Sequence, residues 1–367
     1  MKNNQLTQRI LLIAAAAVLV MIFAVIIFAG FDTRSTFKVG LILTGKTTDT
    51  GWNGSHYNGV ISACEKLKTE LIVKEDIAEG TGDCEKAIHE LAKSGVKMII
   101  LSSYAYPPEV KEVISSYPDI AFYGISSDYN AENMTSYFGR MYQARYLAGI
   151  IAGMQTKTNS VGYVAAMPNS EVNRGINAFT LGVKSVNPEA MVYVSWTNSW
   201  DDAEKEIALA KKLIENKNVD VMTYHQNQHN VAKAADEAGV FSIGYNQATE
   251  GLSEKYLTAA VWNWDELYYQ IIREYVQGKP NSVKQRWLGI ESGAVGLAEL
   301  SSIADEDTVR IYEEEKNRLL TSGDEIFAGE IYDNNGTKRC SDGERLSDET
   351  LLTEMSWYVD GVVVYED

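Results

Sequence analysis

Residues 96–124 read VKMIILSSYAYPPEVKEVISSYPDIAFYG and contain one complete repeat of the pattern that indicates the fold. Its first part, 96–101, is a short apolar run, which is typical of a buried strand. Residues 107–117 follow as a helix with proline near its first turn, and 120–124 is a second apolar strand. Strands that alternate with helices form parallel sheets covered on both faces, so this stretch predicts one unit of such a sheet.

The same alternation extends in both directions and forms two arrays of similar size. The expected strands lie at 38–43, 71–77, 96–101, 120–124, 160–165, 190–196, 219–223 and 240–244. The expected helices lie at 53–68, 84–94, 107–117, 172–185, 203–216 and 230–238. The full length of 367 residues is also enough for two domains of ordinary size. The sequence therefore predicts an α/β protein built on two parallel sheets.

Loops that follow these strands, and a later segment at 261–264, combine aromatic residues with amides or hydroxyls. They lie at 44–56, 102–107, 197–200, 224–227, 245–247 and 261–264. Ligands of parallel sheets bind beyond the carboxyl ends of the strands, so the loops of two facing arrays are expected to line a shared cleft. Aromatic faces suit stacking, and amides supply both donors and acceptors. The candidate ligand-binding residues are Trp52, Asn53, Tyr104, Trp200, Gln226, Asn246 and Trp262. Packing, or a solvated loop position, is the alternative role for each of them.

The N-terminus indicates the compartment. Residues 10–30, ILLIAAAAVLVMIFAVIIFAG, carry no charge and would span about 30 Å as a helix, the thickness of a bilayer core. Lys2 and Arg9 precede this stretch, and positive flanks stay on the cytoplasmic side. We therefore expect a cytoplasmic segment at 1–9, a transmembrane signal anchor at 10–30 and a tether at 31–36, with the large domain on the extracytoplasmic side of the cell membrane.

Two other readings of this N-terminus compete with the anchor. A cleaved signal peptide has a shorter apolar core and a small-residue cleavage site, and 28–31 is a poor site. A lipoprotein signal needs a cysteine after the apolar core, where this chain has Gly30, Phe31 and Asp32. In either of the remaining readings the domain is exported.

Several chemistries are not indicated. The net charge of −17 and the pI near 4.8 repel nucleic-acid phosphates. Residues 45–47 (Gly-Lys-Thr) lack the spacing of a phosphate loop, and the four histidines form no H-E-x-x-H motif. No G-x-S-x-G elbow is present. We therefore predict neither an enzyme nor a nucleic-acid-binding protein, and expect no cofactor or metal.

The three cysteines are Cys64, Cys84 and Cys340. In an exported chain, Cys64 and Cys84 could form a disulfide across a short loop. Two ordinary thiols on neighbouring elements are the alternative. Cys340 lies in a polar stretch and has no obvious partner.

Longer segments resemble a known family. Residues 137–178 read YFGRMYQARYLAGIIAGMQTKTNSVGYVAAMPNSEVNRGINA. Together with 51–56, 187–190, 196–200 and 357–362, they resemble the basic membrane protein family of ABC-transporter substrate-binding proteins, which includes the purine nucleoside receptors. The resemblance covers Phe37 to the C-terminus.

The resemblance implies a type I periplasmic-binding-protein fold, with two Rossmann-like lobes that close like a hinge. The chain would cross between lobes near 137–139 and return near 260–263. The first lobe would contain 37–138 and approximately 263–300, and the second lobe 139–262. Residues 301–367 would complete the lobes with a helix and strands. The implied partners are a small-molecule ligand and an ABC permease in the membrane.

The ligand implied by the family is a purine base or nucleoside. This sequence departs from the nucleoside receptors: Trp52 replaces a phenylalanine, and 225–228 (His-Gln-Asn-Gln) replaces a glycine-rich loop. A sugar-contacting lysine would fall near Trp262, and the usual aspartate is Asn246. These departures favour a free base. A membrane-tethered sensor domain and a sugar-binding protein of the same fold are the alternative functions.

Overall fold

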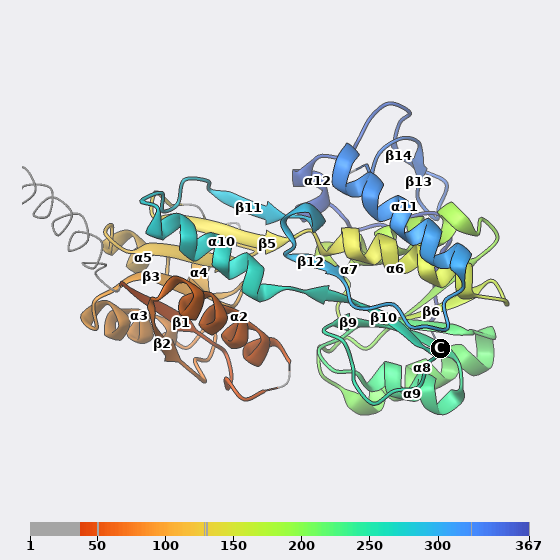
Figure 1. Cartoon of the computed structure of the whole chain (residues 1–367), viewed down its shortest axis with the longest axis horizontal. Coiled ribbons are helices and arrows are strands. Elements are labelled where there is room, and N and C mark those ends of the chain that lie inside the picture. The colour runs from red at the N-terminus through yellow and green to blue at the C-terminus, as the bar shows by residue number, and fades with distance from the viewer. Residues whose placement is uncertain (1–36, 50, 128, 130, 324, 367) are drawn as a thin grey trace, which may run out of the picture.

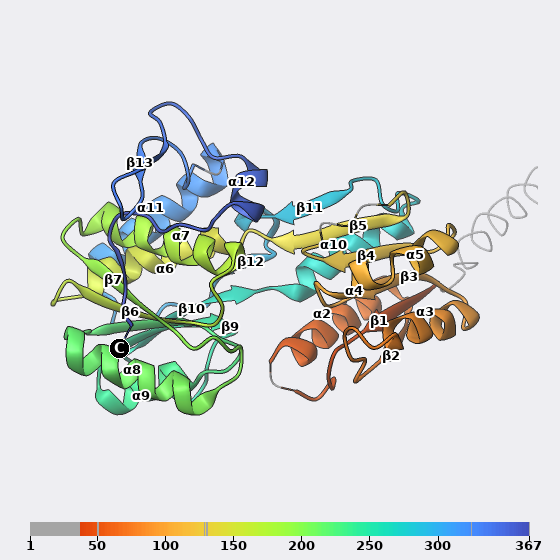
Figure 2. The same cartoon turned by 180° about the vertical axis from the view of Figure 1, so that it is seen from behind.

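The computed structural model describes residues 37–366 apart from 50, 128, 130 and 324 (Figure 1). The predicted anchor at 10–30 and the tether at 31–36 lie outside the described residues. Among the residues that are described, no helix is both long and apolar enough to span a bilayer. The described chain forms two lobes that lie side by side and are joined by extended segments (Figures 1 and 2).

The first lobe is built on a six-stranded sheet with helices on both faces. Every strand pair in this sheet is parallel. Its order is β11 (Gln285–Leu288), β5 (Met134–Gly139), β4 (Ala121–Ile125), β3 (Val96–Leu101), β1 (Lys38–Ile42) and β2 (Glu70–Lys74). One face packs on α2 (Trp52–Leu67) and α10 (Trp264–Val276). The other face packs on α3 (Asp83–Lys93), α4 (Tyr106–Glu109) and α5 (Lys111–Ser116).

The second lobe is built on a seven-stranded sheet. Its order is β12 (Val295–Leu297), β10 (Tyr256–Trp262), β9 (Phe241–Asn246), β8 (Val221–His225), β6 (Ser160–Ala165), β7 (Met191–Trp196) and β15 (Val362–Val364). Only β12 is antiparallel to its neighbour among the described strands of this sheet. One face packs on α6 (Met141–Gln155) and α7 (Ser170–Val186), and the other on α8 (Ala203–Lys217) and α9 (Asn230–Ala238).

Residues 301–367 differ from the expectation that they complete both lobes. α11 (Glu306–Ser322), the hairpin of β13 (Ile331–Tyr332) and β14 (Lys338–Cys340), and α12 (Asp348–Thr353) form an outer layer on α6 and α7 (Figure 2). β15 then pairs with β7 at the edge of the second sheet. The described part of this segment therefore belongs to the second lobe, because its apolar residues share the core of α6 and α7.

The chain crosses between the sheets three times within the described residues: after Gly139, after Trp262, and between Leu288 and Val295. The first two crossings lie near the positions expected from the sequence. The third divides the expected first-lobe segment 263–300, because β12 pairs with β10 through Ala260–Leu297 and Trp262–Val295 contacts. The end of that segment therefore belongs to the second lobe.

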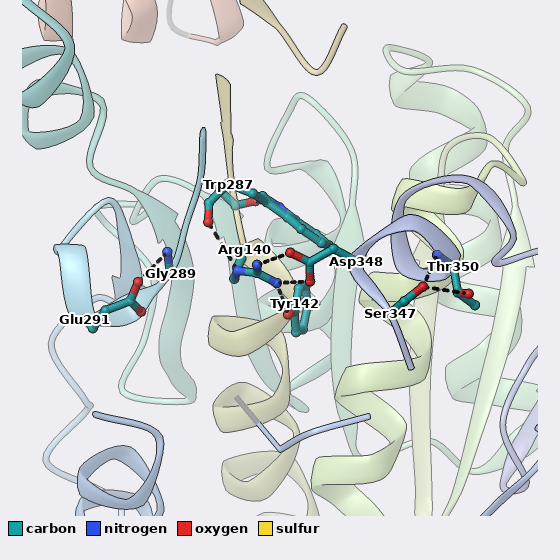
Figure 3. Close-up of polar contacts among 9 residues, drawn as sticks. Arg140, Tyr142, Trp287, Gly289, Glu291, Ser347, Asp348 and Thr350 are labelled. Atoms are coloured by element: carbon teal, nitrogen blue, oxygen red, sulfur yellow. Dashed lines mark hydrogen bonds and ion pairs between the residues drawn. The ribbon is translucent and has the colours of Figure 1, made fainter. Parts of the chain in front are cut away.

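Arg140 connects the crossings to the outer layer (Figure 3). Its guanidinium donates to the Trp287 carbonyl at 3.2 Å and to both Asp348 carboxylate oxygens, at 2.9 and 2.5 Å. It also lies 4.2 Å from the centre of the Trp287 ring. The Trp287 indole N–H in turn donates to the Gly139 carbonyl at 3.0 Å. The first and third crossings are thus fixed to each other and to α12.

Helices α6 and α7 approach each other through glycine. A Cβ atom at Gly149 would lie 2.0 Å from the Phe179 carbonyl oxygen, and one at Gly182 would lie 2.1 Å from the Tyr146 carbonyl oxygen. No side chain can occupy either position without moving a helix, so the two glycines set the distance between the helices.

One open alternative is decided and one local prediction is corrected. Cys64 and Cys84 are free and buried, which agrees with two ordinary thiols and not with the disulfide. Cys64 lies on α2 and Cys84 on α3, which cover opposite faces of the first sheet. The single helix expected at 107–117 is two short helices, α4 and α5, that meet at Val110 with φ −113° and ψ 23°.

Candidate ligand-binding cleft

A cleft lies between the lobes at the carboxyl ends of both sheets. Its inner chamber has a volume of about 310 Å³ and is lined by Thr44, Trp52, Glu79, Ser102, Ser103, Tyr104, Ile125, Ser126, Phe138, Glu171, Trp200, Asn227, Tyr245 and Asn246. A second chamber of about 510 Å³ adjoins it. The two chambers share Tyr104, Ser126, Phe138, Glu171 and Trp200, which therefore form the common wall at the centre of the cleft.

The aromatic lining comes from both lobes. Trp52, at the start of α2, donates its indole N–H to the Ser102 carbonyl at 2.9 Å, which fixes the ring. Its ring also meets His56 edge-on with centroids 4.2 Å apart. Tyr104 follows β3 and is 59% exposed, and Trp200 follows β7 in the other lobe. The structure thus brings these three predicted residues to one cavity.

Asn246 also lines the inner chamber. It ends β9 with φ +74°, a left-handed conformation that asparagine tolerates better than most residues. The side chain is 5% exposed, and its Oδ1 atom accepts no hydrogen bond from the described residues. It therefore offers an unused acceptor at the second-lobe wall.

Three other predicted residues support the cleft without lining either chamber. Asn53 accepts hydrogen bonds from the Thr44 hydroxyl at 3.0 Å and the Gly45 amide at 3.1 Å, and donates to Asp49 at 2.8 Å. Its amide is therefore committed to the loop between β1 and α2. Asn53 therefore does not have the expected role of a residue that hydrogen-bonds to the edge of the ligand.

Gln226 and Trp262 are buried behind the wall. Gln226 donates to the Thr197 hydroxyl at 2.9 Å and so fixes the loop that carries Trp200. Trp262 stacks on Trp264, with centroids 4.6 Å apart and planes 11° apart, and packs against Phe138. Trp262 thus supports the wall at the second crossing.

Glu171 is a cleft residue that the sequence reasoning missed. It lies in the first turn of α7, which Asn169 caps by accepting from the Val172 amide at 3.0 Å. The preceding loop, 166–169, carries no aromatic residue, and aromatic residues were the signal that selected the other loops. The position of Glu171 just after strand β6 was the sequence feature that could have identified it.

The carboxylate of Glu171 is unpaired among the described donors. The His225 ring lies close by, but Glu171 Oε1 and His225 Nε2 are 3.9 Å apart, too far for a hydrogen bond. Burial raises the pKa of Glu171, while the nearby Arg174 and Arg145 act in the opposite direction. The Glu171 side chain is 33% exposed, so the cleft wall contains a partly buried acceptor that has no hydrogen-bond donor among the described residues.

Buried cations lie behind this wall. Arg145 donates to the Tyr224 carbonyl at 2.7 Å and lies 4.1 Å from the centre of the Tyr245 ring. Burial lowers the pKa of His225 well below its usual value, and the charges of Arg145 and Arg174 lower it further. His225 is therefore neutral at pH 7, and neither ring nitrogen has a partner among the described residues.

The lining of the inner chamber contains two carboxylates, Glu79 and Glu171, and no lysine or arginine. Glu79 accepts a hydrogen bond from the Ser103 hydroxyl. Phosphate and carboxylate ligands call for cationic donors, so this lining favours a neutral ligand with hydrogen-bond donors. The described residues contain no group of three or more acidic, histidine or cysteine side chains placed to hold a metal.

Two parallel-sheet lobes, three crossings and a cleft at the strand ends define the class of two-lobed solute-binding domains. Residues 36–326 match the family model for PnrA-like ABC transporter substrate-binding proteins. The chain belongs to this family.

Two relatives and two solved structures are similar to this chain. A purine-binding protein of Brucella abortus is 34% identical over 330 residues, covering 89% of this chain and 92% of that protein. A Haloferax volcanii protein assigned provisionally to glucose binding by an ABC transporter is 31% identical, covering 91% and 82%. A transcriptional activator from Bacillus halodurans has a TM-score of 0.72 at 24% identity, covering 78% and 99%. A solute-binding protein of an ABC transporter from Conexibacter woesei has a TM-score of 0.66 at 18% identity, covering 78% and 97%. These two structures are similar in fold.

Proposed function

We propose that this chain captures a purine, in the form of the free base, and delivers it to an ABC permease in the membrane. The observation that carries this proposal is the lining of the inner chamber. The lining combines Asn246 and two carboxylates, with no lysine or arginine, with five aromatic side chains from both lobes: Trp52, Tyr104, Phe138, Trp200 and Tyr245. A flat, neutral molecule with N–H donors suits that lining. The Brucella abortus relative, named for purine binding, supports the same ligand class.

Calorimetry on the full chain in detergent tests the proposal. The ligands are adenine, guanine, hypoxanthine, their nucleosides and glucose. We expect at least one free base to bind, and to bind more tightly than its nucleoside. A binding signal with glucose, and with none of the purines, would contradict the purine assignment.

A sugar is the second candidate ligand. Aromatic rings stack on pyranose faces, and carboxylates such as Glu79 and Glu171 accept hydrogen bonds from hydroxyls. The Haloferax volcanii relative supports this reading. The same titrations distinguish the two candidates, because a sugar-specific site should bind glucose and should not bind a planar base.

We also propose that residues 10–30 remain as an uncleaved anchor, which holds both lobes on the extracytoplasmic side. The apolar length of this segment and its positive N-terminal flank support the proposal. The protein should then sediment with membranes, resist extraction by alkaline carbonate and keep its original N-terminus. A mature chain that begins near Phe31 would show that the segment is a cleaved signal.

A further inference from the structure

We propose that Glu171 accepts a hydrogen bond from an N–H group of the bound purine and thereby selects among purines that differ in their N–H groups. This inference rests on the proposed function and adds the residue that discriminates between ligands. It concerns a side chain of α7, outside the loops that carry aromatic residues.

The first support is position. Glu171 is the only charged residue on the wall common to both chambers, which it shares with Tyr104, Ser126, Phe138 and Trp200. A planar ligand that contacts the aromatic residues on this wall has its polar edge within the same chamber as the Glu171 carboxylate. Hydrogen bonds to a base edge, combined with stacking on its face, are the usual means of recognising a base outside a duplex.

The second support is the unmet bonding capacity of the carboxylate. An ionised glutamate can accept about four hydrogen bonds, and Glu171 accepts none from the described residues. Its side chain is partly buried, and this burial raises its pKa, so a donor from the ligand would favour the ionised carboxylate. Other carboxylates of the cleft differ in this respect, since Glu79 already has the Ser103 hydroxyl.

The third support is that neighbouring donors are committed elsewhere. Arg145 donates to the Tyr224 carbonyl at 2.7 Å, and Arg174 donates to the Leu351 carbonyl at 2.5 Å. Both guanidinium groups favour the ionised carboxylate through their charge, but neither makes a hydrogen bond to it. The site therefore holds a negative acceptor in place for a donor that comes from outside the protein.

Adenine has two kinds of N–H donor. One is the imidazole N–H, which a nucleoside lacks because the sugar occupies that nitrogen, and the other is the exocyclic amine. Methylation at N9 blocks the first, and dimethylation of the amine blocks the second. Each analogue removes one kind of N–H donor and leaves the other in place. Comparing the two analogues therefore identifies which N–H group contacts Glu171.

The experiment is a double-mutant cycle between protein and ligand, followed by calorimetry. Wild type, Glu171→Gln and Glu171→Ala are titrated with adenine, 9-methyladenine and N6,N6-dimethyladenine. Glu189→Gln is the control, because Glu189 is exposed in the loop before β7, at the far end of the same sheet. Melting temperatures are measured for all variants. Since Glu171 makes no hydrogen bond to the described protein, its replacement should not lower the melting temperature.

We expect both Glu171 variants to bind adenine roughly 10- to 100-fold more weakly, as befits a lost hydrogen bond to a charged group. One methylated analogue should lose a similar factor against wild type and much less against the variants. Glu189→Gln should match wild type. Equal affinities and equal analogue profiles in wild type and both variants would overturn the inference while leaving purine binding intact. If wild type binds no purine at all, the proposed function fails first and this inference fails with it.

Discussion

Residues from the same loops have different positions in this cleft. Trp52, Tyr104 and Trp200 line the inner chamber, whereas Asn53 and Gln226 hold the loops behind them. The aromatic rings should therefore contribute to the free energy of ligand binding by direct contact. Asn53 and Gln226 should contribute indirectly, because they fix the loops that carry the rings.

Replacing Trp200 with alanine tests this view. Stacking on a base contributes on the order of 1–3 kcal/mol by alanine substitution, so Trp200→Ala should weaken adenine binding roughly 5- to 150-fold. Trp200→Phe keeps an aromatic face and should lose much less. Calorimetry provides both affinities. An alanine variant that binds as tightly as wild type would remove Trp200 from the site.

His56 links stability to pH. Burial lowers its pKa to about 3, and its Nδ1 lies 2.5 Å from the Tyr268 hydroxyl. The unfolded chain binds this proton near pH 6.5, so it holds more protons than the folded chain between pH 6.5 and about 3. The free energy of unfolding should therefore fall as pH decreases through this window, by up to about 1.4 kcal/mol per pH unit from this group. Above pH 6.5 His56 should contribute no pH dependence.

Urea denaturation at several pH values measures this slope. In His56→Phe the slope between pH 6.5 and 4 should be shallower than in wild type, because one buried histidine no longer takes up a proton on unfolding. His225, whose pKa burial also lowers, keeps part of the slope in both proteins. Identical slopes in the two proteins would contradict the assignment.

Most of the cleft is predictable from loop position, but the role of each side chain is not. Trp52, Tyr104, Trp200 and Asn246 lie at strand ends, where topology alone sets their location. Asn53 has the residue type and the strand-end position expected of a ligand-binding residue. Only its contacts with Thr44, Gly45 and Asp49 reveal that it holds the loop instead. Such contacts depend on loop conformation, which the residue pattern does not specify.

At the scale of secondary-structure elements, the contact between α6 and α7 depends on glycine. Alanine normally stabilises a helix interior by about 1 kcal/mol relative to glycine. At Gly182 the added Cβ would lie 2.1 Å from the backbone oxygen of Tyr146, so the helices must separate. We expect Gly182→Ala to lower the free energy of unfolding by about 1–3 kcal/mol, the usual cost of overpacking.

Gly175→Ala is the matched control on the same helix. Its new Cβ would lie 3.5 Å from the nearest atom, His225 Nδ1, which is an ordinary contact. This variant should be neutral or stabilised by up to about 1 kcal/mol. In denaturant melts, Gly182→Ala should therefore be clearly less stable than wild type and Gly175→Ala should not. A stabilised Gly182→Ala would show that the helices separate at little cost.

At the scale of the whole molecule, two lobes joined by three crossings are expected to close on the ligand. Saturating adenine should reduce the radius of gyration in small-angle X-ray scattering. Binding at 100 times Kd should also raise the unfolding free energy by about 2.7 kcal/mol and thus raise Tm. A rise in Tm without any change in scattering would mean that the ligand enters a cleft that does not close.

The arrangement of the lobes was only partly accessible from the sequence. The repeated strand–helix pattern predicted two parallel sheets, because each buried strand leaves a continuous apolar run. The C-terminal layer and the third crossing leave no such run: β12, β13, β14 and β15 are three residues long or shorter. Their positions depend on edge pairing and on packing against α6 and α7, which local periodicity does not record.

The placement of tryptophan gives the protein an internal optical reporter. Of its seven tryptophans, Trp52 and Trp200 line the cleft, Trp262 and Trp264 lie at the second crossing, and Trp287 lies at the third. The Trp262 and Trp264 rings are stacked within 11° of parallel, so their electronic transitions are coupled. Any movement of the lobes changes the surroundings of these indoles. Intrinsic fluorescence and near-ultraviolet circular dichroism can therefore follow capture and release of ligand in real time, without an attached dye.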